Sequence, residues 1–295
     1  MMMSENLKDY TKFVNDYIAL HENAARIPLG EAIDAPETES KTDKKIMVCS
    51  PHPDDEVVVG ALPYRLRKEL GANVINLAVT LGSNKDRKIG RLEELVGACR
   101  TLGFKNIVPG GDLALDGVNP KTRDGDSEAW STNVSAIADV LRAEKPDVLL
   151  FPHDNDYNST HIGVHYLMTD ALAVVQKESP DWTPIVFQTE FWHAMETPNL
   201  MVGITPEDEA VMIFALAAHT GEVERNPYHV THPSRMMDNV CRGSEVVGGQ
   251  GGASVDMKLA MIYKASKFIN GNLEDAYEGG RILGPTCDLS ELINL

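Results

Sequence analysis

The chain has 295 residues and an ordinary globular composition, with 43% hydrophobic and 24% charged residues. This length allows one large α/β domain with additions, or two modest domains. The formal net charge of -17 at pH 7 argues against a nucleic acid or an anionic membrane as the main partner, because either would require a basic face.

Cysteine spacing and the N-terminus indicate the compartment. The four cysteines are far apart and form no CxxC pair, so no disulfide framework is indicated. The opening segment MMMSENLKDY lacks the apolar region of a signal peptide, and no apolar run is long enough to span a bilayer. We therefore expect a soluble, cytoplasmic protein that acts on a small molecule.

Residues 1–44 are predicted to form an N-terminal helical extension and linker, and residues 45–295 the main domain. Apolar residues recur at helical spacing from Leu7 to Ile18, and the following DAPETESKTDKK is polar and contains a proline. The pattern leaves open whether this helix is a lid or a contact in a homo-oligomer.

Strand patterns alternate with helix patterns from Lys45 onward. Strands are predicted at 45–50, 73–79, 147–152 and 184–192. Helices are predicted at 57–71, 87–104, 131–145 and 160–176, the third stopped before Pro146. Ser131 is the expected N-cap of the third helix, and Pro63 is expected to kink the first. The alternation predicts an α/β fold with a mostly parallel sheet covered by helices on both faces.

A C-terminal, α-rich decoration is predicted beyond about residue 195. Thr205 and Pro206 begin a well-signalled helix at 205–219, and 255–268 is predicted to be a last amphipathic helix. The glycine-rich segment 243–254 lacks the GxxxxGK[ST] pattern. It therefore indicates a mobile loop or tight turn, not a nucleotide-binding loop.

The segment PHPDDE places His52, Asp54, Asp55 and Glu56 directly after the first strand. One or two of these acids could simply cap the helix that follows. Crowded carboxylates repel one another unless they are protonated, paired or bound to a cation, so a divalent metal explains the whole cluster better. His52 and Asp55 can both face one metal across the turn, which leaves Asp54 beside it as a general base.

The third ligand is expected in HDNDYNSTHIGVHYL, which follows the strand at 147–152. Ligands gather beyond the carboxyl ends of parallel strands, so this segment should meet the first cluster. His161 is preferred because it lies near the start of a helix. An HxxxH pair of His161 with His165 is a rival assignment, and His153 is either a supporting or an ordinary loop residue.

These motifs resemble the LmbE/PIG-L-like zinc-dependent N-deacetylases. PHPDDE is the signature of that family, and the helix from Arg91 to Gly103 matches its R-x-x-E-x-x-x-A-x-x-x-L-G pattern. The resemblance implies a Rossmann-like domain in which one zinc is held by His52, Asp55 and His161. It also implies that Asp54 is the general base and that Arg91 grips the substrate; a surface pair of Arg91 with Glu94 is the alternative.

The chain departs from the family pattern before His161. Many relatives read HPDH where this chain has Asn158-Ser159-Thr160-His161. Asn158 can donate a hydrogen bond to an oxyanion but cannot donate a proton as an acid. The general acid is therefore open: Asp54 returns the proton that it took, or His165, His219 or another residue serves. Thr160 replaces the aspartate of the motif, so the support of His161 is in question.

The resemblance implies a hydrolase that removes an N-acetyl group from an N-acetylglucosamine-type amino sugar or its glycoside. A faint similarity around His219 implies that this residue binds substrate. The segments EFWHAMETPN and NPYHVTHPSRMMDN either line a sugar site or pack as loops. A metal-dependent sugar-binding protein without hydrolysis is the alternative. A dinucleotide-binding oxidoreductase ranks last, because no GxGxxG follows the first strand.

Overall fold

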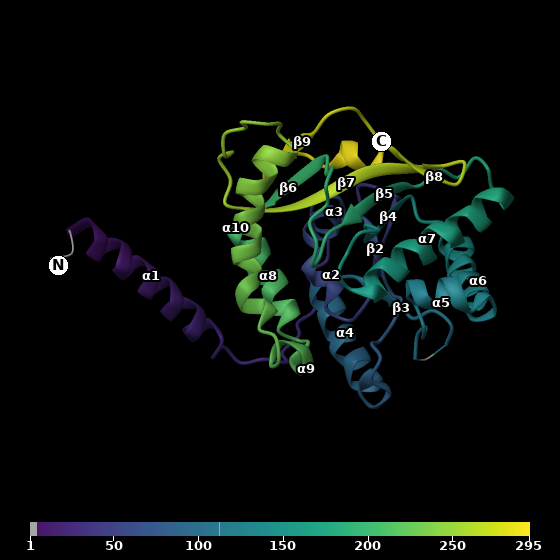
Figure 1. Ribbon diagram of the computed structural model, residues 1–295, viewed down its shortest axis with the longest axis horizontal. Helices are drawn as coiled ribbons and strands as arrows, with labels where there is room; N and C mark the ends of the chain where they lie inside the picture. The colour runs from purple at the N-terminus through teal and green to yellow at the C-terminus, as the bar shows by residue number, and fades with distance from the viewer. Residues whose placement is uncertain (1–4, 112) are drawn as a thin grey trace.

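A central sheet organises the chain in the computed structural model, which describes residues 5–111 and 113–295 (Figure 1). The strands are β1 Lys45–Ser50, β2 Asn73–Ala78, β3 Lys105–Ile107, β4 Val148–Pro152, β5 Ile185–Thr189, β6 Leu200–Ile204, β7 Leu259–Ile269, β8 Asn272–Asp275 and β9 Arg281–Leu283. Their order among the described residues is β3-β2-β1-β4-β5-β7-β6-β9, and β8 pairs with β7. From β3 to β5 every pairing is parallel, which confirms the predicted Rossmann-like α/β fold.

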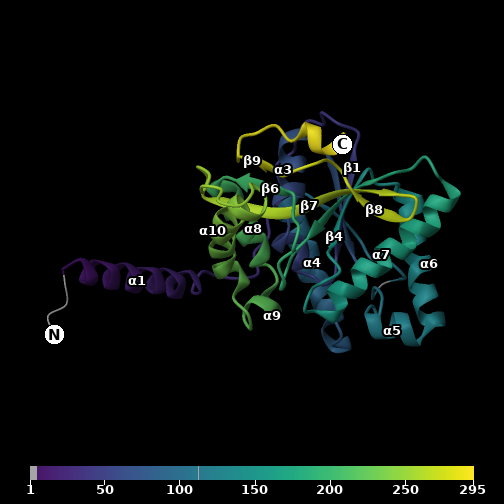
Figure 2. The ribbon, with the colours of Figure 1, turned by 45° about the horizontal axis from the view of Figure 1, so that its top comes forward.

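Helices cover both faces of this sheet (Figures 1 and 2). The α-helices are α1 Glu5–Ala24, α2 Asp55–Val58, α3 Ala61–Leu70, α4 Lys88–Leu102, α5 Pro120–Gly125, α6 Ser127–Glu144, α7 Ser159–Glu178, α8 Pro206–Leu216, α9 Thr220–Val223 and α10 Tyr228–Val246. Short 3-10 turns lie at η1 Lys85–Arg87 and η2 Ser290–Ile293. No described helix combines the length and apolarity that crossing a bilayer requires.

Alternate side chains of the strands enter two separate cores. In β1, Ile46 and Val48 pack with residues of α3, α4 and α8, whereas Met47 and Cys49 pack with residues of α6 and α7. Successive side chains of a strand point to opposite faces, so a strand buried on both sides reads as a continuous apolar run. This burial fixes the register of β1 between β2 and β4.

Two predicted details of the helices are corrected. Pro63 does not kink a long helix, because α2 ends at Val58 and α3 begins at Ala61. Pro63 thus lies in the first turn of α3, where a missing N–H breaks no helical hydrogen bond. The third predicted helix begins at Ser127, and its N-cap is Asp126 in place of Ser131, since the Asp126 side chain accepts from the Ala129 N–H.

The C-terminal part is predicted from its sequence to be α-rich and to end in a helix at 255–268. That last helix is wrong. Most of that segment is β7, which pairs with β5 and β6 as an antiparallel strand inside the same sheet. The side chains from Leu259 to Tyr263 are all buried. A short apolar run has the same pattern in a buried helix as in a central strand, which explains the error.

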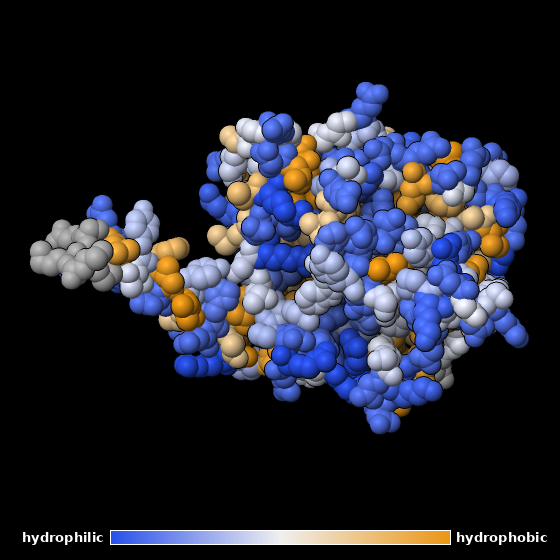
Figure 3. All heavy atoms as spheres, in the orientation of Figure 1, coloured by the Kyte–Doolittle hydropathy of each residue, from blue (hydrophilic) through white to orange (hydrophobic). Residues whose placement is uncertain are grey.

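The arm α1 stands apart from the rest of the chain (Figure 2). Its apolar residues from Tyr10 to Leu20 are exposed, and Figure 3 shows hydrophobic residues along it. It meets the body where the Tyr17 hydroxyl and the Ser234 hydroxyl of α10 lie 2.7 Å apart. The helix itself confirms the sequence pattern, whereas the domain boundary after residue 44 stays a prediction.

Candidate metal centre and its cavity

The candidate site lies where the chain changes direction in the sheet. β1 and β4 are parallel neighbours, but β1 leads toward β2 on one side and β4 leads toward β5 on the other. Loops diverge at such a switch point and leave a crevice beyond the carboxyl ends of the strands. His52 and Asp55 follow β1, and His161 lies in the first turn of α7 after β4.

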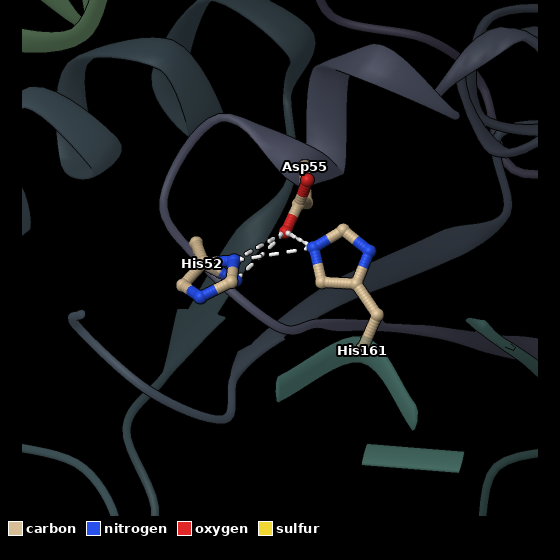
Figure 4. A group of neighbouring side chains, drawn as sticks. All are labelled: His52, Asp55 and His161. Atoms are coloured by element: carbon tan, nitrogen blue, oxygen red, sulfur yellow. Dashed lines mark hydrogen bonds and ion pairs between the residues drawn. The ribbon is translucent and has the colours of Figure 1, made fainter. Parts of the chain in front are cut away.

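Three side-chain atoms converge at this point (Figure 4). The distance from His52 Nδ1 to Asp55 Oδ2 is 3.2 Å, from His161 Nε2 to His52 Nδ1 is 3.2 Å, and from His161 Nε2 to Asp55 Oδ2 is 3.4 Å. Ligand atoms on a tetrahedral zinc ion, about 2.0–2.2 Å from the metal, lie about 3.3–3.6 Å from one another. The triangle therefore fits a divalent ion, and the structure brings together the three residues predicted as ligands.

The environment of His161 supports a role as a ligand. Its Nδ1 is buried and makes no hydrogen bond, and the nearest carboxylate oxygen, Oδ2 of Asp156, is 3.7 Å away. Burial lowers the pKa of His161, but the charges of Asp55 and Asp156 outweigh it and raise the pKa to about 9. Burial raises the pKa of Asp55, but His161 and His52 outweigh it and lower that pKa. A cation would replace this proton among the same carboxylates.

Asp156 is a functional residue that sequence reasoning missed. Its buried carboxylate accepts the N–H groups of Asn158 and Trp192, at 2.8 and 3.2 Å, and these bonds fix it behind His161. Its Oδ2 is the carboxylate oxygen that faces His161 Nδ1, at 3.7 Å, so its charge acts on the ring without a hydrogen bond. The signal in the sequence is the Asp156–Asn158 spacing, which is typical of an Asx turn before a helix.

Asp54 lies beside the triangle and lines the same cavity. Its φ of 110° is in the left-handed region, which is unfavourable for a residue other than glycine. The Asp54 N–H donates to Glu56 Oε2 at 3.0 Å, and this bond helps to hold the strained turn. Burial and the neighbouring Asp55 raise the pKa of Asp54 well above its usual range, whereas Arg91 opposes the shift.

The prediction that His219 binds substrate is corrected by its position. His219 is buried and does not line the cavity; its Nε2 lies 2.8 Å from Glu56 Oε1. Both oxygens of Glu56 are therefore used, one by His219 and one by the Asp54 N–H. His219 supports the turn that carries Asp54 from behind.

Arg91 and Asn158 do line the cavity. Arg91 donates to the Pro53 carbonyl at 2.9 Å, and Glu94 instead accepts from Thr220 and Gly221, so the surface pair of Arg91 with Glu94 does not form. The Asn158 side-chain oxygen caps α7 through the Thr160 N–H. Only the amide N–H groups of Asn158 remain to donate into the cavity.

The other two histidines of this segment, His153 after β4 and His165 in α7, contact main-chain carbonyls. His165 Nδ1 lies 2.9 Å from the Pro152 carbonyl, and its ring packs edge-on against Phe151. His153 Nε2 lies 2.9 Å from the His193 carbonyl. The rival assignment of His161 with His165 as a metal pair is therefore not supported by the geometry.

The cavity above the triangle has a volume of about 440 Å³. Its outer wall comes from the two segments whose role the sequence left open. Trp192 follows β5 and Tyr228 begins α10, and their rings lie 5.8 Å apart at a steep angle. The remaining lining includes both acidic and basic groups: Asp54, Asp55, Glu222, Arg91, Arg225 and Arg235.

Comparison with known families identifies the part of the chain that carries this site. Residues 47–172 match the family model described as PIG-L, GlcNAc-PI de-N-acetylase. They form a domain of the PIG-L (LmbE-like) family, which confirms the resemblance seen in the motifs. No curated protein matches the chain by sequence.

Solved structures share the fold at low sequence identity. The N,N'-diacetylchitobiose deacetylase of Pyrococcus horikoshii is 16% identical, with a TM-score of 0.55, and covers 88% of this chain and 93% of its own. GalB of Pseudomonas putida KT2440, a 4-carboxy-2-hydroxymuconate hydratase, is 18% identical, with a TM-score of 0.56 and coverages of 75% and 95%. The zinc-inhibited form of the teicoplanin deacetylase Orf2 is 15% identical, with a TM-score of 0.50 and coverages of 76% and 99%. Because a hydratase shares the fold, the fold alone does not define the reaction.

Proposed function

We propose that this protein is a metal-dependent hydrolase that removes an N-acyl group, in the first instance acetyl, from an amino sugar or its glycoside. The observation that carries the proposal is the triangle of His52, Asp55 and His161 with Asp54 free beside it in one cavity. The PIG-L family match at 47–172 supports hydrolysis of an N-acyl group, and two of the structures with a similar fold are named as deacetylases.

His52, Asp55 and His161 would hold the ion, with zinc as our proposal for its identity. A divalent ion bound there supplies Lewis-acid chemistry, since it polarises a carbonyl and makes water more acidic. Asp54 would take a proton from the attacking water and return it to the leaving nitrogen. The same carboxyl group can hold the proton between these two transfers.

The cavity wall supports a sugar-like substrate. Trp192 is 56% exposed beside Tyr228, so an aromatic surface is available to the apolar face of a pyranose ring. Arg91 and the amide of Asn158 add donors for hydroxyl or carbonyl oxygens. This mixture of a few polar groups with aromatic walls is typical of small-molecule sites.

The test is a hydrolysis screen with purified protein loaded with one equivalent of zinc. Candidates are N-acetylglucosamine, its disaccharide and its simple glycosides, and released acetate is measured against a chelated control. We expect acetate release from at least one of them, lost on chelation. Saturable binding of these sugars without any acetate release would instead support the non-hydrolytic sugar-binding alternative.

A further inference from the structure

Arg235 is a cation on the cavity wall without an opposing carboxylate. Helix α10 brings it to the cavity that contains His52, Asp55 and His161. Its Nη2 donates to the main-chain carbonyl of Glu190, an acceptor that carries no net charge. Within 5–111 and 113–295, no carboxylate forms an ion pair with Arg235, and its guanidinium makes no second hydrogen bond.

The neighbouring carboxylate is already occupied. Glu190 Oε1 accepts from Arg242, which lies two turns further along α10, and Glu190 Oε2 accepts from the Met195 N–H. Glu190 therefore balances Arg242 with its side chain and positions Arg235 with its backbone. The two arginines of α10 differ in that only Arg235 lines the cavity.

The opposite charges that act on Arg235 are those of Glu190 first and then of two carboxylates at the metal centre. Burial lowers the pKa of Arg235, while Glu190, Asp55 and Asp156 act in the opposite direction. When a divalent ion is held by Asp55, its positive charge offsets that of the carboxylates around it. The guanidinium of Arg235, which is partly buried, then faces a cavity whose other acids, Asp54 and Glu222, form no ion pair with it. An anionic group that enters the cavity would supply the missing partner.

The other two arginines of the cavity, Arg91 and Arg225, have other neighbours. Arg225 pairs with Glu222 at the exposed rim. In the described part of the chain Arg91, like Arg235, donates only to a main-chain carbonyl, that of Pro53, but its charge acts on Asp54, the proposed base. On the triangle side, Asn158 offers only a neutral amide, since its oxygen caps α7. Among the described arginines of this cavity, Arg235 is thus the one that has neither an ion pair nor the proposed base Asp54 as its neighbour.

We propose that Arg235 is a catalytic residue that donates hydrogen bonds to the acyl oxygen of the substrate as that oxygen becomes negative. Water oxygen bonds to the acyl carbon as Asp54 takes one water proton, and the carbonyl π pair moves onto the acyl oxygen. When the pair returns, the carbon–nitrogen bond breaks and the nitrogen leaves with the proton held by Asp54. The second water proton passes from the new carboxyl group to the released amine. Arg235 keeps its own protons throughout, and the resulting carboxylate is an anion that it can bind. This inference rests on the proposed function.

The kinetic test compares Arg235→Gln and Arg235→Lys with Arg142→Gln. Arg142 lies on the outer surface of α6, paired with Glu178, so its variant removes one positive charge far from the cavity. We expect Arg235→Gln to lower kcat by about 100- to 1,000-fold with KM changed by only a few fold, typical of a lost oxyanion donor. Arg235→Lys should recover part of kcat, and Arg142→Gln should match the unaltered protein. All variants should keep one zinc per chain.

A binding test separates this inference from the proposed function. Acetate is titrated into the zinc-loaded proteins, and its affinity should be about 10- to 100-fold weaker in Arg235→Gln, as for loss of a charged hydrogen bond. If no acetylated sugar is hydrolysed but acetate binding still depends on Arg235, the reaction is wrong and the anion site stands. Unchanged acetate affinity together with unchanged kcat overturns the inference. A fall in kcat that only follows lost zinc also overturns the inference. If Arg235→Gln does not fold, Arg235→Lys supplies the same comparison, and its acetate affinity should be weakened.

Discussion

Two groups of buried histidine and carboxylate side chains meet at the turn after β1, and they differ in how their atoms are satisfied. His161 and His219 are each only 1% exposed. His219 and Glu56 form a closed pair in which each carboxylate oxygen has one donor. His161 faces His52 and Asp55 so that three ligand atoms crowd together at the wall of a cavity. Residue type and burial therefore do not distinguish a metal ligand from a supporting residue. The difference is that three ligand atoms lie close together in one group, whereas each oxygen of Glu56 has its own donor in the other.

The largest effect should come from removing one corner of the triangle. We expect His161→Ala to lose zinc and all measurable hydrolysis, because two ligands cannot hold the ion at the affinity of three. His219→Ala, a loss of an equally buried histidine, should keep one zinc per chain. Elemental analysis after gel filtration compares the two. Full zinc occupancy in His161→Ala would show that the ligand set is wrong.

Next in size is the removal of the proposed base. Asp54→Asn should keep its zinc and lose about 100- to 10,000-fold in kcat, as expected for loss of general-base catalysis. The reason is that the amide keeps the size and turn position of Asp54 but cannot accept the water proton. Steady-state kinetics on the substrate found by hydrolysis, with zinc content measured in parallel, checks this. An unimpaired kcat would exclude Asp54 as the base.

A smaller effect is expected behind the triangle. Asp156→Asn should weaken zinc binding by about 10- to 100-fold, because the carboxylate that faces His161 Nδ1 loses its charge. Asp154→Asn is the matched control, since Asp154 is exposed two residues earlier in the same loop. Competition with a chromophoric chelator measures both affinities. Equal affinities in the two variants would mean that Asp156 only shapes the loop.

The sequence predicts well what is encoded by neighbouring residues. PHPDDE after an apolar run placed His52, Asp54 and Asp55 at the end of β1, and parallel strand order brought His161 to the same edge. Helix ends with local signals were equally clear, as at Thr205, the N-cap of α8, whose side chain accepts from the Asp208 N–H. In these cases the residues that determine the feature are close in sequence, or they follow neighbouring parallel strands whose carboxyl ends meet at one edge of the sheet.

Features that depend on distant packing were not accessible in this way. The run around Met261 becomes a strand only because β5 and β6 lie on either side of it. Asp156 is recognised as a support of His161 only when the loop is folded. Several strands and helices lie between His161 in α7 and Arg235 in α10 along the chain. That Arg235 lines the cavity, and that it has no ion-pair partner among the described residues, is seen only in the folded chain.

The smallest effect tests the closed pair directly. His219→Ala leaves Glu56 Oε1 buried without its donor, so the free energy of unfolding should fall by about 1–3 kcal/mol. His219→Gln, which can still donate to Glu56, should recover part of this loss. Because Glu56 also holds the Asp54 N–H, kcat should fall in His219→Ala, but by less than in Asp54→Asn. Chemical denaturation and kinetics with zinc held at one equivalent measure both quantities. Unchanged stability with a rate as low as that of Asp54→Asn would make His219 part of the reaction and would erase the distinction between the two groups.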